Sequence, residues 1–324
     1  MHKDANQQPF THLQHAFTRF FHGEAGYPTF KKQGVHDSFY VSNDKIIVEG
    51  MRLGIPRLGW VKMREAVQFQ GKILGVTITR EAGRWSVSIQ VDVGAYARPR
   101  TADGVVGVDL GVSTLATLST GEKVESPKPL TRLLKRLQTL QRRVSRKQQG
   151  SRNRRKAIQR LARLHRRISN IRHDVLHKLT SQLTSENQVV AIEDLNVQGM
   201  MANHHLARAI SDMGFYEFRR QLTYKAKLTH TEMIVVDRWY PSSKTCSRCG
   251  KYLEHLTLAH RTTGCDCGPS MDRDHNAAIN LARVGYTRSH AYGDASGGGT
   301  MATSVYESCI VEAGTTPCAR LRTR

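Results

Sequence analysis

The chain has 324 residues, which is enough for two domains with hydrophobic cores. Its 49 Lys and Arg against 27 Asp and Glu give a formal net charge of +22, which indicates a polyanionic partner such as nucleic acid. A membrane span is not expected, because the sequence contains no run of about 18 apolar residues and no signal-like leader, so we expect a soluble, cytoplasmic protein.

The first predicted domain is β-rich and covers residues 1–104. Apolar and polar residues alternate through 38–93, which predicts a small antiparallel sheet or barrel with a turn at 81–84. The alternating segments are 45–49, 73–79 and 85–91. A linker is expected at 98–100.

A second domain is expected to open with a buried strand at 105–111, which carries a carboxylate and a glycine turn. Helical periodicity over 130–182, broken at Gly150, predicts a long helical hairpin. This hairpin contains 17 Lys and Arg and a single acidic residue, Asp174, which leaves a net charge of +16. A charge run is often only a solvated helix face, but the near absence of compensating acids favours contact with phosphates.

Two further buried strands are predicted at 189–193 and 233–237, followed by a cysteine-containing loop and a helix over 274–283. From residue 285 onward, Gly, Ser and Thr predominate, which predicts a poorly ordered tail over 285–324. Cys309 and Cys318 lie in this tail, and no role is assigned to them.

Three acids have positions that suit catalysis. Asp109 and Glu193 end apolar strands, and Asp274 opens a helix. Three carboxylates can hold two Mg²⁺ ions ~4 Å apart, which activate water and stabilise the leaving oxygen of a phosphodiester. Taken singly, each acid has a plainer interpretation as a turn or helix cap. Asp194 should point to the opposite strand face and Asp272 should cap the helix, so neither joins the candidate set.

Four of the six cysteines lie between residues 246 and 267, which indicates a metal site before a disulfide scaffold. Cys246 and Cys249 have the spacing of a zinc knuckle, and Cys265 and Cys267 form a tighter Cys-x-Cys pair. Free thiols or a disulfide are the alternatives. Four protein ligands would leave no open coordination position, so one Zn²⁺ ion bound here would be structural.

The segments Gly107-Val-Asp-Leu-Gly-Val-Ser-Thr114, Ile192-Glu-Asp-Leu195 and Asp272-Arg-Asp-His-Asn-Ala-Ala-Ile-Asn280 surround the cysteine loop in this order. Together they resemble the TnpB/OrfB family encoded by insertion sequences, relatives of type V CRISPR effectors. The resemblance covers about residues 28–284. It implies an α/β fold with an RNase H-like (RuvC-like) nuclease domain. In that domain Asp109, Glu193 and Asp274 are the catalytic acids and Mg²⁺ ligands.

The resemblance also implies the domain order. A wedge or OB-like domain over 1–104 precedes the first part of the nuclease domain, 105–239, which includes the hairpin. A zinc ribbon over 240–268 and the last nuclease part, 269–284, follow. The ribbon departs from the family pattern, because Gly264 occupies the place of an expected cysteine. Trp60 and the aromatics of 27–32 resemble wedge positions that contact guide RNA and target duplex; burial in the core is the alternative that we favour.

The implied function is RNA-guided DNA cleavage by two-metal-ion hydrolysis. A guide RNA derived from the transposon end pairs with target DNA, which places the protein at the nucleoid. Family members usually carry a further helical segment ahead of the wedge, so a truncated or non-cutting regulator, either RNA-guided or simply DNA-binding, is one alternative. A zinc-ribbon nucleic-acid binder without a guide is another. His204 and His205 are expected in an exposed loop, although a metal role is conceivable.

Overall fold

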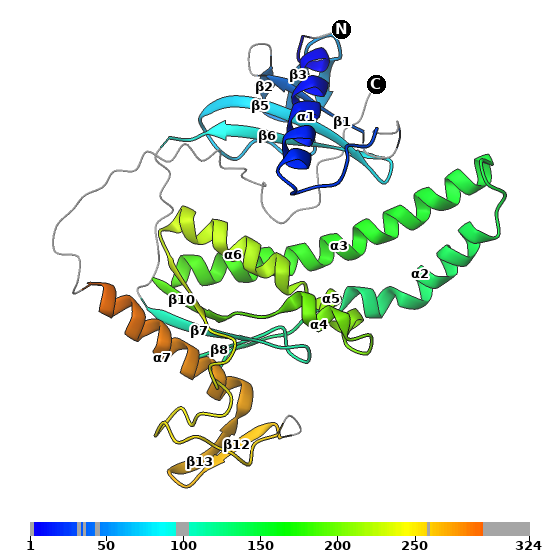
Figure 1. Ribbon diagram of the computed structural model, residues 1–324. Coiled ribbons are helices and arrows are strands. Elements are labelled where there is room, and N and C mark those ends of the chain that lie inside the picture. The colour runs from blue at the N-terminus through cyan, green and yellow to red at the C-terminus, as the bar shows by residue number, and fades with distance from the viewer. Residues whose placement is uncertain are drawn as a thin grey trace. The chain divides into compact units, whose positions relative to one another are not determined.

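The computed structural model describes residues 3–30, 34, 37–42, 46–94, 104–257 and 260–293 (Figure 1). These residues form two compact units. The first contains the described residues up to 94 together with 140–166, and the second contains 104–139 and 167–293. The expected linker at 98–100, Cys309 and Cys318 lie outside the described residues. In the described ranges, no helix combines the length and apolar character needed to cross a bilayer.

The first unit contains helix α1 (Lys3–Phe21) and two antiparallel three-stranded sheets, ordered β1-β5-β6 and β2-β3-β4. The strands are β1 (Asp37–Ser42), β2 (Ile47–Glu49), β3 (Arg52–Ile55), β4 (Gly59–Lys62), β5 (Lys72–Glu81) and β6 (Arg84–Asp92). Ala82 and Gly83 join β5 to β6 with φ angles of 51° and 74°, as in a tight hairpin turn. The antiparallel sheet and its turn are as the alternation predicts.

The aromatics of this unit differ from expectation. Trp60 is 52% exposed, Tyr27 is 70% exposed and Phe30 is fully exposed, so the prediction that they lie in the core was wrong. The cause in β4 is the strand period, which turns Val61 into the core and Trp60 outward. The Trp60 ring instead lies over Gly54 on the neighbouring strand.

The second unit is built on a five-stranded sheet with the order β11-β10-β7-β8-β9. Strands β7 (Val105–Leu110), β10 (Val189–Glu193) and β11 (Glu232–Val236) are parallel, while β8 (Ala116–Leu118) and β9 (Lys123–Val124) continue antiparallel from β7. The three predicted buried strands are therefore confirmed. Their near-continuous apolar sequence suits a sheet covered on both faces.

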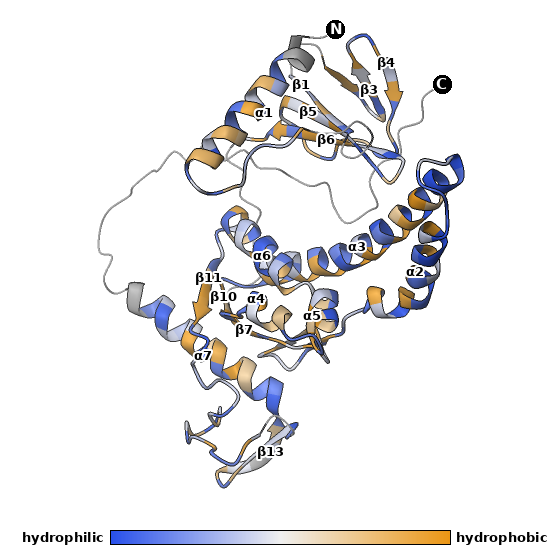
Figure 2. Cartoon of the chain, turned by 45° about the vertical axis from the view of Figure 1, so that its right-hand side comes forward, coloured by the Kyte–Doolittle hydropathy of each residue, from blue (hydrophilic) through white to orange (hydrophobic). Residues whose placement is uncertain are grey.

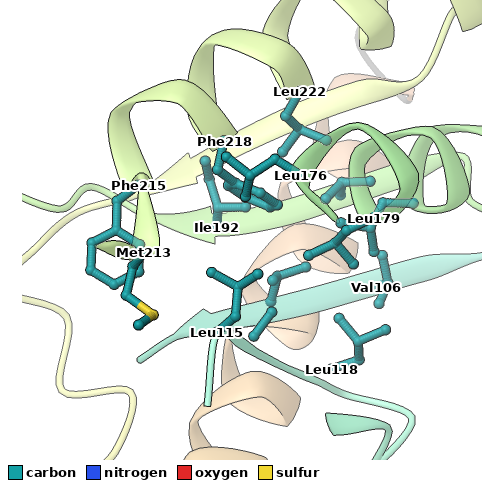
Figure 3. Packing of buried hydrophobic residues seen from close by; sticks show 14 of the residues in the cluster. Val106, Leu115, Leu118, Leu176, Leu179, Ile192, Met213, Phe215, Phe218 and Leu222 are labelled. Atoms are coloured by element: carbon teal, nitrogen blue, oxygen red, sulfur yellow. The ribbon is translucent and has the colours of Figure 1, made fainter. Parts of the chain in front are cut away.

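Helices cover both faces of this sheet (Figure 1). Val190 and Ile192 point to the face covered by α3 (Arg152–Glu186) and α6 (Phe215–Thr229), where Phe218 and Leu222 pack (Figure 3). The intervening residue Ala191 points to the opposite face, covered by α7 (Arg273–Gly293). Short helices α4 (Val197–Ala202) and α5 (Ala207–Met213) connect β10 to α6.

Helix α7 lies unusually close to the sheet. A Cβ atom at Gly107 of β7 would be 2.0 Å from the carbonyl oxygen of Ala278. Near the other end of the contact, a Cβ atom at Gly285 would be 2.9 Å from the Cβ of Ala191. Only glycine permits these approaches. The helix continues to Gly293, past residue 285, where the poorly ordered tail was expected to begin. The reason is that Val284 and Gly285 pack on the sheet.

The predicted hairpin is formed by α2 (Pro129–Ser145) and α3, with hydrophilic residues gathered at its closed end (Figure 2). The guanidinium of Arg154 closes the connection by donating to the carbonyls of Val144 and Lys147 at 2.8 and 3.1 Å. Residues 140–166 belong to the first unit, whereas the whole hairpin was expected in the second. Within that unit, the buried guanidinium of Arg166 donates to the Glu81 carbonyl and the Ser86 hydroxyl, both at 3.1 Å.

A buried carboxylate fixes the start of α2. Asp212, 1% exposed, accepts hydrogen bonds from the backbone N–H groups of Leu130 and Thr131 at 3.0 and 2.9 Å. It also pairs with Arg172 of α3 at 3.6 Å. Asp212 thus acts as a helix cap supplied from another helix, and it ties both arms of the hairpin to α5.

We expect Asp212→Ala to lower the free energy of unfolding by about 3 kcal/mol, because it removes a cap and leaves the Arg172 charge without its buried partner. Urea denaturation followed by circular dichroism measures this. The matched control is Asp174→Ala, which breaks the surface pair with Lys178 and should cost at most about 0.5 kcal/mol. Equal losses in the two variants would contradict the assigned role of Asp212.

Candidate active site and metal centres

The carboxyl ends of β7 and β10 bring two of the predicted acids to one edge of the sheet. Ile192 is paired with Val108, so the next residues along these parallel strands, Glu193 and Asp109, lie side by side. Asp274 lies in the first turn of α7, which packs directly on β7. The sheet and the helix therefore bring the three acids, which are far apart in the sequence, to a common region.

The electrostatics of Asp109 reflect this proximity. Burial, and then the charges of Asp274 and Glu193, raise the pKa of Asp109 from 3.8 to about 7. Arg273 opposes the shift without cancelling it. A half-buried carboxylate near three other acids and one opposing cation is a place where a divalent cation would lower the free energy. The donor set, carboxylate oxygens alone, is the kind that Mg²⁺ prefers.

Glu193 differs from its neighbour Asp194. Burial, followed by the charge of Asp194, raises the pKa of Glu193. Asp194 forms ion pairs with Arg219 and Arg238, and hydrogen bonds from Arg238 and then Arg219 lower its pKa. Because its charge is already compensated, Asp194 stays outside the candidate set, as the strand alternation predicts.

The start of α7 is fixed by residues around Asp274. The Asp272 carboxylate accepts a hydrogen bond from the backbone N–H of His275 at 3.0 Å, so Asp272 is the helix cap that the sequence predicts. Its other oxygen accepts from the ammonium group of Lys123 at 2.8 Å. The His275 ring also lies 3.2 Å from the carbonyl oxygen of Ser119. These contacts hold the first turn of α7 against the β8–β9 hairpin.

Two basic residues near the acids, Lys123 and Arg273, were not predicted from the sequence. The hydrogen bond to Asp272, and then the charges of Asp272 and Asp274, raise the pKa of Lys123. The charge of Arg273 lowers the pKa of Asp109. Arg273 is held by the Thr257 carbonyl and the Ser243 hydroxyl at 3.3 and 3.5 Å. No local motif marks Lys123, because its partner is 149 residues away in the sequence. The position of Arg273 between Asp272 and Asp274 was the available signal.

The four predicted zinc ligands come together. The Sγ atoms of Cys246, Cys249, Cys265 and Cys267 all lie within 4.8 Å of one another. The Cys246–Cys267 and Cys249–Cys265 sulfur distances are 3.5 and 3.6 Å. They are too long for a disulfide, which is about 2.05 Å, and suit four thiolates around one ion with Zn–S bonds of about 2.3 Å. Among the described residues, these four cysteines are the group of His, Cys, Asp or Glu side chains whose ligand atoms lie close enough together to bind one metal ion.

The Cys-x-Cys pair works because it occupies a hairpin turn. Cys265 ends β12 (Thr262–Cys265) and pairs with Gly268, the first residue of β13 (Gly268–Asp272). Asp266 and Cys267 therefore form the turn, and the register shifts at Gly264, whose Cβ position is open space. The turn brings the two thiols together without the cysteine expected at 264. In the first knuckle, the backbone N–H groups of Cys249 and Arg248 lower the pKa of Cys246 to about 6.

The hairpin presents its charge outward. Thirteen of its 17 Lys and Arg are exposed, and Arg166 is the buried one. Asp174, the single acid within residues 130–182, is paired with Lys178 at 2.7 Å and neutralises one nearby cation. This distribution fits a phosphate-binding surface better than a mixed-charge solvated helix. His204 and His205 are exposed at the end of α4, as expected for a polar loop.

The sequence is similar to those of several known proteins. The family profile OrfB_IS605, described as a probable transposase, matches residues 87–204, and the Cas12f1-like TNB domain profile matches 215–281. A Streptomyces pristinaespiralis protein named "Putative RNA-guided DNA endonuclease" is 40% identical over 297 residues, which is 89% of this chain and 72% of that protein. "Putative RNA-guided DNA endonuclease InsQ" of Escherichia coli K12 is 34% identical, covering 86% and 74%.

Among solved structures, the protein in a cryo-EM structure of the Cas12f1-sgRNA-target DNA complex has a similar fold. The TM-score is 0.54 at 13% identity, covering 84% of this chain and 69% of that one. At this identity, the likeness concerns the fold alone.

The raised pKa of Asp109 predicts a pH-dependent stability. The folded state binds the proton more tightly than the unfolded state, so its stability falls as pH rises from about 4 to about 7 and then levels off. Asp109→Asn removes this penalty. In Mg²⁺-free buffer, calorimetry should give the variant a Tm higher than that of the wild type by on the order of 5 °C at pH 8, and by much less at pH 5. If the Tm difference between the variant and the wild type were the same at pH 8 and pH 5, the raised pKa of Asp109 would be contradicted.

The cysteine cluster predicts one equivalent of zinc per chain in the purified protein, measured by plasma mass spectrometry. Cys267→Ser should lower that content by more than half, because three thiolates bind zinc less tightly than four. Cys309→Ser, which lies outside the described residues and outside the cluster, is the control and should retain the full equivalent. A zinc-free wild-type protein would refute the site.

Proposed function

The chain belongs to the TnpB/OrfB family, and from this membership together with the acid cluster we propose that it is an RNA-guided DNA endonuclease. Its reaction centre is formed by Asp109, Glu193 and Asp274. The observation that carries the proposal is that Asp109 lies half-buried at the sheet edge, within the electrostatic reach of the other two acids. Concentrated, uncompensated negative charge is costly to fold and is useful for holding divalent cations.

In the proposed mechanism, the three carboxylates would hold two Mg²⁺ ions, which would supply water activation and charge neutralisation for phosphodiester hydrolysis. Asp109 would bind as a carboxylate, a form that its pKa of about 7 makes predominant only above that pH in the metal-free protein. Lys123 and Asp272 keep the first turn of α7, and with it Asp274, in register with the sheet. No covalent intermediate with the protein is required.

We also propose a domain type for each part of the chain. The second unit is an RNase H-like (RuvC-like) domain, supported by a mixed sheet in which the antiparallel strands β7-β8-β9 are extended by the parallel strands β10 and β11. The region 240–268 is a structural zinc ribbon with one ion. The first unit is the wedge domain, in which the exposed Trp60 and Phe30 are available to nucleic acid.

The partners are target DNA and a guide RNA derived from the transposon end. Base pairing between RNA and DNA supplies the sequence specificity, while the protein holds the heteroduplex by its shape and backbone charge. The exposed cations of the hairpin are suited to that contact, because their attraction to phosphates does not depend on the base sequence. The relatives named above support an RNA-guided activity, and the transposon origin of the RNA is our inference.

The test is to express the chain with its native flanking DNA, to sequence the RNA that copurifies, and to reprogram that RNA against a plasmid. We expect Mg²⁺-dependent cleavage, which Asp109→Ala lowers by roughly 10³-fold or more while RNA binding stays within about twofold. Glu232→Gln, an exposed acid at the opposite end of the strands, is the matched control and should cut normally. Cleavage that persists in Asp109→Ala would overturn the assignment, and RNA binding without any cleavage would indicate a regulator.

A further inference from the structure

The loop that follows β11 presents a tryptophan to solvent. Trp239 is 85% exposed, which is the highest exposure among the three tryptophans of the chain; Trp60 is 52% exposed and Trp85 packs partly against the core of the first unit. A large apolar side chain held in water is costly unless a partner covers it at some stage.

The position of this loop is set by strand register. Glu193 of β10 is paired with Val236 of β11, and the backbone N–H of Asp194 donates to the Val236 carbonyl at 2.9 Å. Residues 237–239 therefore continue from the same sheet edge that carries Glu193 and Asp109. Neighbouring strands in a sheet lie about 4.8 Å apart, so the loop borders the proposed reaction centre.

The loop is held rigidly. The Asp237 carboxylate accepts a hydrogen bond from the backbone N–H of Trp239 at 2.8 Å, and the Asp237 carbonyl accepts from Tyr240 at 3.0 Å. Tyr240 packs against the apolar cluster of Val189 and Leu281. The indole is therefore presented from a turn anchored on both sides.

Two arginines lie beside this turn with more positive charge than their partner neutralises. Arg238 and Arg219 share the single carboxylate of Asp194, while the Asp237 carboxylate of the same turn accepts from the backbone of Trp239. Their side chains are 41% and 45% exposed. A guanidinium has five N–H donors, and each of these arginines spends one on Asp194, so donors remain for a phosphate.

We propose that Trp239, Arg219 and Arg238 form a binding surface for the single DNA strand that enters the reaction centre. The indole stacks on one base and the guanidiniums contact flanking phosphates. Stacking accepts any base, which suits an enzyme whose sequence choice lies elsewhere. The role of Asp194 is to position the two arginines. This inference rests on the proposed function for the identity of the strand, while the stacking itself is testable without cleavage.

The binding arm uses the full chain with its copurified RNA and a 12-nucleotide oligothymidine in Mg²⁺-free buffer. Stacking quenches indole emission, so wild-type fluorescence should fall on titration, and the part due to Trp239 should be missing in Trp239→Phe. Trp239→Ala should weaken oligothymidine binding about tenfold, whereas Trp239→Phe, which retains a ring, should stay within about threefold. Arg219→Gln should lower the slope of log affinity against log salt by about 0.7.

The controls are Tyr286→Ala and Arg283→Gln on α7. They flank Val284 and Gly285, which pack near Val105 and Val189 at the opposite end of the strands. Neither should change binding or quenching. Unchanged quenching in Trp239→Phe, or equal affinity in Trp239→Ala, would overturn the proposal.

The cleavage arm separates this inference from the proposed function. With reprogrammed RNA and Mg²⁺, Trp239→Ala should lower the single-turnover cleavage rate about tenfold, and Trp239→Phe should restore most of it. If the wild type quenches on oligothymidine but never cuts, the nuclease assignment fails and the stacking surface stands. If the wild type cuts and Trp239→Ala cuts equally fast, the strand-binding surface fails and the nuclease assignment stands.

Discussion

A carboxylate partly withdrawn from water beside other acids is the constraint on which the proposed reaction centre depends. Desolvation first, and then the charges of Asp274 and Glu193, raise the pKa of Asp109 to about 7. The surrounding structure resists their separation. Gly107 lets α7 rest directly on β7, and the contacts of Lys123 and Asp272 fix the first turn that carries Asp274.

The molecule separates its charges by function. Acidic groups concentrate at the sheet edge, while the hairpin carries most of the net positive charge on exposed positions. Asp212 links the two regions within the second unit, because it caps α2 from a helix that packs on the sheet.

The sequence predicted features governed by local pattern. Apolar runs identified β7, β10 and β11, and the cysteine spacing identified the four thiols that cluster in the fold. Features that depend on distant partners could not be predicted: Asp212 contacts Leu130 across 82 positions of sequence, and Lys123 reaches Asp272 across 149. The extension of α7 was missed because glycine, usually a sign of loops, here serves close packing at Gly285.

The central claim is that Asp109, Glu193 and Asp274 share a pair of divalent cations. Anomalous diffraction from crystals soaked in Mn²⁺, which replaces Mg²⁺ at oxygen sites, tests it most directly. The account predicts two peaks ~4 Å apart, each within bonding distance of carboxylate oxygens from these three residues. Peaks absent from this sheet edge, or bound by other acids, would contradict it.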